Sequence, residues 1–473
     1  MIVGAADWTP GDIARAVLGH VEGDPSRRLL GVATDTRDPL RQALFVALVG
    51  EKHDAHQFLD TAVEAGASAL LVEAARLSPE QQARLSARVS LILVPDTTTA
   101  LGDLAKAHLL RHRSHLKIAG LTGSNGKTST KEMLAALCGV GRRTLKTQGN
   151  LNNLIGLPMT ALRVDGAHDV AVLEMGMNRL GEIARMTEIA RPDVGLITNV
   201  GPAHIGELGG MDNIQRAKGE LFRGLEASAT AIVNLDDPRV VAEAQHAGTS
   251  KARTFGRTTG ADVLLVSSRE EGEGQILELY VDGTRLEAEL PYPGAHNALN
   301  AAGAVAAATA LFALSDNEIR AGLAAAERVG GRLSARPLGE WLLLDDSYNA
   351  NSASTIAAIR TAGDRARREG RRFVAFLGEM RELGSYADEE HQKVGRAAAE
   401  AGAAFVAAFG PLASPLAAAA SSGGILAQHE AEDAARLFAW ARPKLEARDL
   451  ILVKGSRGIH MEQFVKLLEE GRG

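Results

Sequence analysis

A glycine-rich loop between a predicted strand and a predicted helix constrains this chain more than any other feature. The sequence Gly-Ser-Asn-Gly-Lys-Thr occupies residues 123–128, after an apolar run at 116–122 and before a helical pattern. Backbone N–H groups of such a loop can approach phosphate oxygens, Lys127 can reach the β- and γ-phosphates, and Thr128 can ligate magnesium. The loop predicts nucleotide binding, although Leu121 stands where a complete Walker A motif has its first glycine. The alternative is an ordinary glycine turn that caps a helix.

Short apolar runs followed by helical patterns recur along the chain, as is typical of parallel β-sheets. In the same sheet as the loop we predict further strands at 170–173, 194–198 and 231–234. From 263 to 290 polar and apolar residues alternate around Asp282 and Gly283, which predicts a hairpin. A helix rich in small residues is expected at 295–314.

Two further series of strands flank this central part. We predict strands at 43–48 and 69–72 before it, and at 341–344, 373–377, 404–409 and 450–453 after it. The length of 473 residues suits three domains, which we place at 1–97, 98–329 and 330–473. The predicted fold class is α/β: a central parallel-sheet P-loop ATPase-like domain, flanked by a small N-terminal α/β domain and a C-terminal Rossmann-like α/β domain. Junctions between such domains are natural places for a ligand cleft.

Composition excludes several other classes. The chain carries 52 Lys and Arg against 58 Asp and Glu, so a net charge of -6 argues against a nucleic-acid partner. Cys138 is the single cysteine, which leaves no internal disulfide, and we expect it to be a small core residue. Residues 1–10 lack a secretory signal pattern, and glycines and prolines interrupt the uncharged stretch at 401–428. We therefore expect an intracellular protein without a membrane-spanning segment.

Two polar residues follow predicted strands near the loop. Glu174 comes after the strand at 170–173, and His204 follows the strand at 194–198. Both are expected at the carboxyl edge of the sheet, where ligands bind in open α/β sheets. A carboxylate and an imidazole there could hold a divalent cation that bridges nucleotide and substrate. Taken alone, each is more often an ordinary polar loop residue than a ligand, and Lys218 alone would be assigned to a solvated helix face.

A set of motifs in fixed order extends through all three predicted domains. They are Thr-Gly-Ser-Asn-Gly-Lys-Thr at 122–128, Gln-Gly-Asn-Leu-Asn-Asn-Leu-Ile-Gly at 148–156, Glu-Met-Gly-Met-Asn at 174–178, Asn-Val-Gly-Pro-Ala-His-Ile at 199–205, Ala-Lys-Gly-Glu at 217–220, Gly-Ala-His-Asn at 294–297 with Asn300, Asp-Asp-Ser-Tyr-Asn-Ala-Asn at 345–351, Leu-Gly-Glu-Met-Arg-Glu-Leu-Gly at 377–384 and Lys-Gly-Ser-Arg at 454–457. Together they resemble the Mur ligase family, and within it the branch that adds D-alanyl-D-alanine.

The resemblance implies an ATP-dependent amide-forming ligase of cytoplasmic peptidoglycan precursor synthesis. In this family a substrate carboxylate attacks the γ-phosphate of ATP, and an amine then attacks the resulting acyl phosphate. The implied substrates are UDP-N-acetylmuramoyl-tripeptide and D-alanyl-D-alanine, with ATP and Mg2+ as cofactors. Because both steps gather negative charge, catalysis should rest on positioning and electrostatic stabilisation. We expect a monomer.

The resemblance also assigns roles to individual residues. The implied catalytic residues are Lys127, Glu174, His204 and Lys218. The implied ATP-binding residues are Gly123, Ser124, Asn125, Gly126, Lys127, Thr128, Ser129, Asn297, Arg332 and Asp346, with His296 and Asn300 near the base. The implied metal ligands are Thr128, Glu174, His204 and Lys218, the last as a carbamate, in which the ammonium has become an anion.

The resemblance implies substrate contacts in each of the three predicted domains. Thr36 and Arg37 of the first domain suit the uridine diphosphate end of the sugar nucleotide, since a hydroxyl and an arginine suit a diphosphate. Asn152 and Asn153 are candidates for contact with the peptide arm, because side-chain amides pair with amide groups in both directions. In the third domain, Glu379, Arg381 and Glu382 are candidates for the dipeptide side. Alternatively, such loop residues could simply form turns and surface ion pairs.

Other functions fit parts of the pattern. A relative could use another amine, such as a meso-diaminopimelate- or lysine-adding ligase, or a folylpolyglutamate synthase. A nucleotide-switched binding module is the candidate from a different class, and it predicts nucleotide binding without an amide product. The motifs at 152–153 and 377–384 favour the D-alanyl-D-alanine-adding branch. The family often has proline where this chain has Ser352, a departure that touches no proposed catalytic group.

Overall fold

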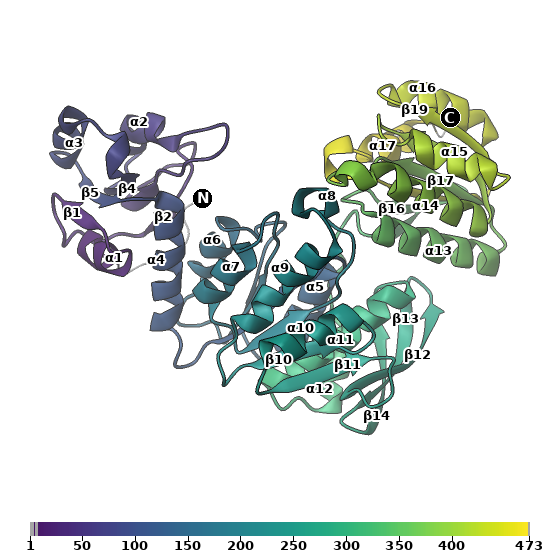
Figure 1. Cartoon of the computed structure of the whole chain (residues 1–473), viewed down its shortest axis with the longest axis horizontal. Helices are drawn as coiled ribbons and strands as arrows, with labels where there is room; N and C mark the ends of the chain where they lie inside the picture. The colour runs from purple at the N-terminus through teal and green to yellow at the C-terminus, as the bar shows by residue number, and fades with distance from the viewer. Residues whose placement is uncertain (1–3, 5–7, 472–473) are drawn as a thin grey trace.

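Three β-sheets with helices packed on them make up the chain, so the predicted three-part α/β class is confirmed. The computed structural model describes residue 4 and residues 8–471. Residues 1–3 and 5–7, in the segment that carries no secretory signal pattern, lie outside the described residues. Figure 1 shows the three units side by side, with the central unit between the other two. The domain boundaries at 97 and 330 stay a prediction.

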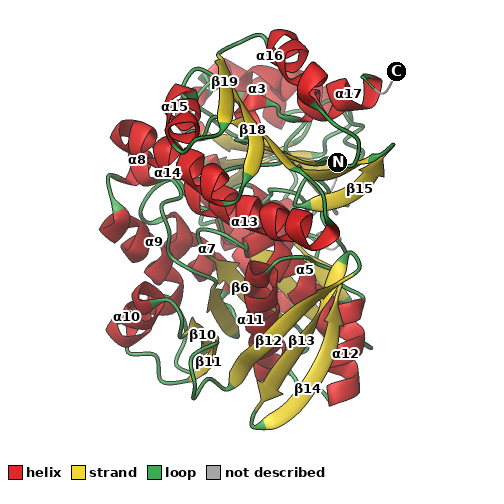
Figure 2. Ribbon diagram, turned by 90° about the vertical axis from the view of Figure 1, so that its right-hand side faces the viewer, coloured by secondary structure: helices red, strands yellow, loops and turns green. Residues whose placement is uncertain are grey.

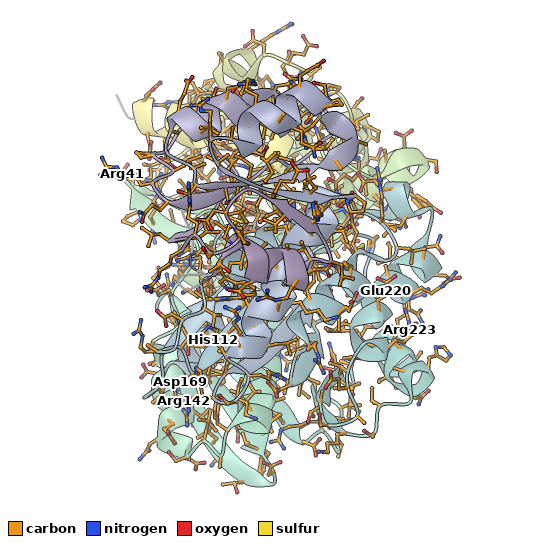
Figure 3. The ribbon with its side chains drawn as sticks, turned by 90° about the vertical axis from the view of Figure 1, so that its left-hand side faces the viewer. Arg41, His112, Arg142, Asp169, Glu220 and Arg223 are labelled. Atoms are coloured by element: carbon orange, nitrogen blue, oxygen red, sulfur yellow. The ribbon has the colours of Figure 1, made fainter. Side chains whose placement is uncertain are left out.

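The N-terminal unit is built on a five-stranded sheet in the order β1-β5-β4-β3-β2. Its elements are α1 (Pro10–Ala16), β1 (His20–Glu22), β2 (Gly31–Ala33), β3 (Ala43–Val46), α2 (Leu59–Glu64), β4 (Ala69–Glu73), α3 (Pro79–Ser86) and β5 (Ser90–Val94). The pairs β2–β3, β3–β4 and β4–β5 are parallel, and β1 is antiparallel to β5. Figure 3 views this unit from outside, with Arg41 projecting at its edge.

A nine-stranded sheet forms the central unit, in the order β14-β13-β12-β11-β10-β9-β6-β8-β7. Its strands are β6 (Lys117–Thr122), β7 (Thr144–Lys146), β8 (Val170–Glu174), β9 (Val194–Ile197), β10 (Thr230–Asn234), β11 (Ala252–Gly256), β12 (Val263–Glu271), β13 (Gly274–Val281) and β14 (Thr284–Leu290). Its helices are α4 (Thr97–Arg111), α5 (Lys127–Cys138), α6 (Gly156–Ala161), α7 (Glu182–Ala190), α8 (Ile205–Leu208), α9 (Met211–Arg223), α10 (Pro238–Ala247), α11 (Ala295–Leu311) and α12 (Asp316–Ala324). The sheet is parallel from β7 to β12, and the predicted hairpin around Asp282 and Gly283 joins β13 to β14.

Small side chains bring the helices of this unit close to the sheet. On one face α5, α11 and α12 pack against the strands, and most of the buried positions of α11 are alanine. Alanine leaves little bulk between helix and strand, so backbone and neighbouring side chains pack densely. Cys138 lies fully buried in α5, as expected for a small core residue. The start of α5 is therefore held firmly over the edge of the sheet.

The C-terminal unit has a six-stranded sheet in the order β15-β16-β20-β17-β18-β19. Its elements are β15 (Ser334–Leu338), β16 (Trp341–Asp346), α13 (Ser352–Glu369), β17 (Phe373–Gly378), α14 (Ala387–Glu400), β18 (Ala403–Phe409), α15 (Ser414–Ser422), β19 (Leu426–Glu430), α16 (Ala434–Ala441), β20 (Leu450–Lys454) and α17 (Glu462–Glu470). Only β15 runs antiparallel to its neighbour.

Helix α13 joins the C-terminal unit to the central one. Figure 2 shows it lying across the end of the strands β12 to β14. Arg365 of α13 forms an ion pair with Glu273 at 2.6 Å, and Arg368 pairs with Glu270 at 2.5 Å. In this arrangement the carboxyl ends of β6 and β16 lie close to one cavity. No helix among residues 8–471 has the length and apolar character needed to cross a membrane.

Candidate active site

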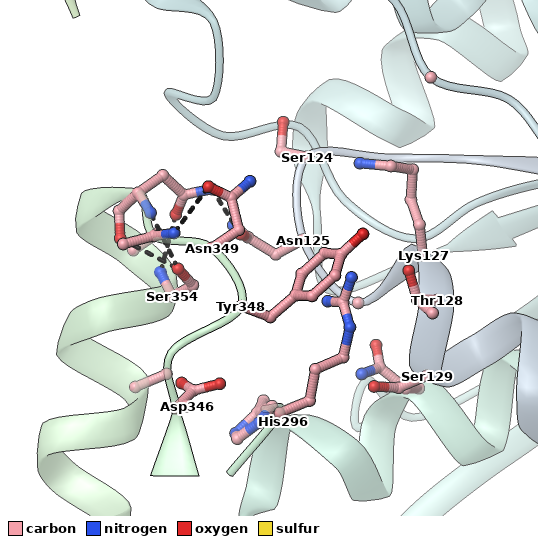
Figure 4. A pocket seen from close by; sticks show the side chains of 18 of the residues that line it. Ser124, Asn125, Lys127, Thr128, Ser129, His296, Asp346, Tyr348, Asn349 and Ser354 are labelled. Atoms are coloured by element: carbon pink, nitrogen blue, oxygen red, sulfur yellow. Dashed lines mark hydrogen bonds between the residues drawn. The ribbon is translucent and has the colours of Figure 1, made fainter. Parts of the chain in front are cut away.

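A cavity of about 520 Å³ lies between the central and C-terminal units. Residues of the glycine-rich loop line it on one side, and residues that follow β16 and β20 line it on the other. Figure 4 looks into this cavity, with Lys127 and Thr128 on the opposite side from Asp346 and Asn349. The sequence places Lys127, Glu174 and His204 at one sheet edge, and all three line this cavity.

The loop at 123–128 has the backbone geometry that its glycines permit. Gly126 has φ of 80°, and a Cβ at this position would lie 2.4 Å from Asn300 Oδ1. Gly123 lies against Thr198, whose hydroxyl would be 1.8 Å from a Cβ there. The Thr198 hydroxyl instead donates to the Asn125 carbonyl oxygen at 2.6 Å. The loop is therefore ordered by the neighbouring strand end.

The ammonium of Lys127 lies at the start of α5 inside this loop. It donates to the Gly123 carbonyl oxygen at 2.8 Å. Loss of solvent lowers the pKa of Lys127, whereas the nearby Glu174 carboxylate opposes that change. A cation held beside the N-terminus of a helix gives this end of the cavity a strong preference for anions such as phosphate.

Glu174, at the end of β8, faces the same loop. Its Oε1 accepts from Asn152 Nδ2 at 2.9 Å and lies 3.4 Å from the Thr128 hydroxyl. Its Oε2 is buried without a partner among the described residues. A buried carboxylate oxygen without a donor is costly unless a cation or a ligand satisfies it. Hydroxyl and carboxylate oxygens are the donors that Mg2+ prefers, so Thr128 and Glu174 fit that ion.

His204 and Lys218 are the other two implied metal ligands. His204 lines the cavity, but its Nδ1 lies 2.7 Å from Glu382 Oε2 of the C-terminal unit. With Glu207, these two residues form a group whose potential ligand atoms all lie within 4.8 Å of one another. Lys218 lies buried in α9 and is not among the residues that line the cavity. Burial and the nearby Lys127 lower the pKa of Lys218 well below its usual value.

The side of the cavity that the sequence assigned to adenosine is formed by α11 and the C-terminal unit. His296, Asn297 and Asn300 line it, and burial lowers the pKa of His296 to about 4. The guanidinium of Arg332 lies 4.5 Å from the centre of the Tyr348 ring, and its buried Nε has no partner among the described residues. Such a cation, held against an aromatic face, is available to a phosphate.

Asp346, at the end of β16, is held by Lys454, which lies in the motif at 454–457 but was assigned no role from the sequence. Lys454 Nζ donates to Asp346 Oδ2 at 2.6 Å and to the Asn349 carbonyl oxygen at 2.9 Å. Asp346 Oδ1 accepts from the Leu333 backbone N–H at 3.1 Å. Burial raises the pKa of Asp346, and Lys454 opposes that rise. Tyr348 also lines the cavity and was missed, although it lies within the motif at 345–351.

The four implied substrate residues do not lie together. Asn152 lines the cavity, whereas Thr36 and Arg37 do not, and Arg37 Nε forms a hydrogen bond to Asp35 at 3.0 Å on the surface. Asn153 Oδ1 accepts from the backbone N–H of Gly156 at 2.8 Å, which supports the start of α6. Of the remaining predicted ATP-binding residues, Ser124, Asn125, Gly126 and Ser129 line the cavity, whereas Gly123 is not among its lining residues.

Direct contacts connect the central unit to the C-terminal unit. Asn351 Nδ2 donates to Asn125 Oδ1 at 2.7 Å, and the Gly206 backbone N–H donates to the Glu382 carbonyl oxygen at 2.9 Å. The arrangement can hold a nucleoside triphosphate with its phosphates at the start of α5 and its sugar near Asp346. It leaves the space around Glu174 and Asn152 for a second reactant.

Comparisons with known proteins agree along the whole chain. Three family models match: "Mur ligase family, catalytic domain" over residues 30–109, "Mur ligase middle domain" over 121–308, and "Mur ligase, glutamate ligase domain" over 331–457. The UDP-N-acetylmuramoyl-tripeptide--D-alanyl-D-alanine ligase of Escherichia coli (strain K12) is 38% identical over 445 residues, which is 93% of each chain. The enzyme of the same name from Bacillus subtilis (strain 168) is 35% identical, again over 93% of each chain.

Solved structures give the same result. A crystal structure of MurF from Acinetobacter baumannii superposes with a TM-score of 0.88 at 33% identity, covering 98% of this chain and 99% of that one. MurF ligase from Thermotoga maritima in complex with ADP has a TM-score of 0.78 at 26% identity, covering 93% of this chain and 97% of that one.

Proposed function

The chain belongs to the Mur ligase family, and we propose that it joins D-alanyl-D-alanine to UDP-N-acetylmuramoyl-tripeptide in an ATP-dependent reaction. The observation that carries this proposal is the single cavity in which the phosphate loop, Glu174 and residues of the C-terminal unit meet. The names of the relatives, which match over 93% of the chain, supply the two substrates.

ATP would bind across the junction of the central and C-terminal units. The backbone of residues 123–128 and Lys127 would hold its phosphates, with Arg332 as a second cation. Asn297 would contact the base and Asp346 the ribose hydroxyls. The cavity lining supports this orientation, and the Thermotoga maritima relative in complex with ADP supports nucleotide binding itself. Because the nucleotide would touch both units, its binding would favour their closed arrangement.

The donor set fits Mg2+ as the cofactor. Thr128 and the unpartnered Oε2 of Glu174 would hold one ion, and Glu174, His204 and Lys218 would support a second. When bound, the ions supply positive charge that balances the charge gathered on the phosphates. Lys218 could contribute only as a carbamate, because its ammonium would repel a cation. A lysine must be neutral to react with carbon dioxide, and its lowered pKa supports that state.

The proposed reaction has two steps. An oxygen of the tripeptide carboxylate attacks the γ-phosphorus, the bond to the β-phosphate oxygen breaks, and ADP leaves. The dipeptide amine then attacks the acyl carbon, phosphate leaves, and the nitrogen loses a proton as the amide forms. Lys127 would neutralise phosphate oxygens in the first step, while Asn152 would orient the peptide arm beside Glu174.

The outer units would bind the remaining parts of the substrates. We assign residues 1–97 to the sugar nucleotide, with Thr36 and Arg37 at its diphosphate, residues 98–329 to ATP, and residues 330–473 to the dipeptide and part of ATP. Asn153 would act beside Asn152 mainly by supporting the turn into α6. We further propose a monomer that works in the cytoplasm, where the nucleotide-linked substrate and ATP are both available.

A panel of amines tests the proposal. The protein is incubated with ATP, magnesium and UDP-N-acetylmuramoyl-tripeptide, and phosphate release and product mass are measured for D-alanyl-D-alanine, lysine, meso-diaminopimelate and glutamate. We expect an adduct only with the dipeptide. An adduct with a single amino acid instead, or ATP binding without any amide product, would refute the assignment.

A further inference from the structure

A buried threonine holds the backbone of Glu174 from the neighbouring strand. Thr147 follows β7, the edge strand of the central sheet, and is fully buried. Its hydroxyl accepts from the Glu174 backbone N–H at 2.9 Å, and its own N–H donates to the Val172 carbonyl oxygen at 3.0 Å. The position of Glu174 therefore depends on how Thr147 is held.

A buried lysine holds Thr147 in turn. Lys131 lies one helical turn after Lys127 in α5, and only 1% of its surface is exposed. Its Nζ donates to the Thr147 carbonyl oxygen at 2.8 Å and forms an ion pair with Glu132 Oε1 at 2.9 Å. Burying an ammonium group is costly unless its donors are satisfied, and an apolar side chain would fill the same space without that cost.

A chain of hydrogen bonds connects α5, the helix that follows the phosphate loop, to the backbone of Glu174. Lys131 is not among the residues that line the cavity, and the described hydrogen bonds connect it to Glu174 through Thr147. At the other end, Asn152 and Thr128 occupy the Oε1 side of Glu174, which leaves Oε2 directed to a ligand. Helix α5 thus positions Thr128 directly and Glu174 through Lys131.

We propose that Lys131 is a positioning residue that acts through Thr147 to fix the Glu174 carboxylate where it receives a divalent cation. This inference rests on the proposed function, in which Thr128 and Glu174 hold that cation. Groups that orient metal ligands in this way typically change metal affinity about 10- to 100-fold when they are removed.

Binding of Mn2+ measures this effect without turnover. Electron paramagnetic resonance follows Mn2+ bound to the full-length protein with a non-hydrolysable ATP analogue. We expect Lys131→Met to weaken Mn2+ binding about 10-fold, and Thr147→Val to weaken it by a similar factor. Both changes break the same connection from Lys131 through Thr147 to Glu174. The double variant should therefore bind Mn2+ no more weakly than either single variant. In both single variants, the KM for the UDP-linked substrate should change by less than about twofold.

Lys146→Met is the matched control. Lys146 directly precedes Thr147 in the chain, and its side chain pairs with Glu132 at 2.5 Å and with Glu327 at 3.1 Å. None of the described hydrogen bonds joins this side chain to Thr147 or Glu174. We expect its Mn2+ affinity to stay close to that of the unchanged protein. Lys131→Arg keeps a donor and should recover part of the affinity lost in Lys131→Met, which a loss of packing alone would not do.

Three results would overturn the inference: unchanged Mn2+ affinity in Lys131→Met, losses that multiply in the double variant, or an equal loss in the Lys146 control. If Lys131→Met does not fold, Thr147→Val decides, because it keeps the side-chain volume and removes only the hydroxyl. Absence of amide product in the unchanged protein would refute the proposed function alone, since the Mn2+ measurement does not depend on turnover.

Discussion

Replacing Lys454 by methionine tests how the C-terminal side of the cavity is stabilised. Lys454 and Asp346 are both largely buried, and the 2.6 Å contact between them is the main compensation for the Asp346 carboxylate. Without Lys454, that carboxylate keeps the hydrogen bond that the Leu333 backbone N–H donates to its Oδ1. Breaking one side of a buried ion pair typically costs about 3 kcal/mol or more. We expect that loss in the free energy of unfolding at pH 7, and roughly a 10 °C fall in the Tm of this unit.

The stability loss expected in Lys454→Met depends on pH through the ionisation of Asp346. Burial raises the pKa of Asp346, so this group favours the folded state most at low pH and loses that contribution as the pH rises through its folded-state pKa. Lys454→Met removes the opposing cation and raises that pKa further. The difference in stability between variant and unchanged protein should therefore be largest at neutral pH and shrink on acidification, when the carboxyl binds a proton.

Intrinsic fluorescence provides the assay. Trp341 and Trp440 lie in the C-terminal unit, so their emission follows its unfolding in urea. Adding Asp346→Asn to Lys454→Met removes the isolated charge and should recover more than about half of the lost stability. A Lys454→Met variant as stable as the unchanged protein at pH 7, or a difference that grows on acidification, would refute the reasoning.

Two further predictions concern lysines of the central unit. Lys127→Ala should reduce turnover about 100-fold or more, because it removes a cation from the phosphates, and near-normal phosphate release with both substrates present would contradict its role. Lys218→Ala should lose most activity and regain part of it with added formate or acetate, measured as rescue kinetics. No rescue at any carboxylate concentration would count against a carbamate at this position.

Several strands with continuous apolar runs, although not β5, could be predicted from the sequence. Residues 170–173 and 373–377 are buried on both faces of their sheets, so the pattern alone identified them, and they became β8 and β17. Short edge strands could not be predicted in the same way. β7 spans only Thr144–Lys146 and pairs with β8 alone, and β19 is half polar because one edge is free.

Residues on loops after strands could be placed near the cavity, but their partners could not. Glu174 and His204 both line it, as their positions after β8 and β9 predicted. The contact of His204 with Glu382, and that of Lys454 with Asp346, depend on how two units and two distant strands are arranged. Residues 346 and 454 meet because β16 and β20 are neighbours in the sheet, and no local pattern contains that information.

Lys127 and Lys218 can take different roles in this site because their surroundings differ. Loss of solvent lowers the pKa of both Lys127 and Lys218, but Glu174 opposes the change only at Lys127. At Lys218 the neighbouring charge is Lys127 itself, which lowers the pKa further. Lys127 is thus the lysine favoured to remain a cation that holds phosphate, and Lys218 is the one favoured to be neutral. Conversion of Lys218 to a carbamate would also place an anion near Lys127, so each group would stabilise the charge that the other needs.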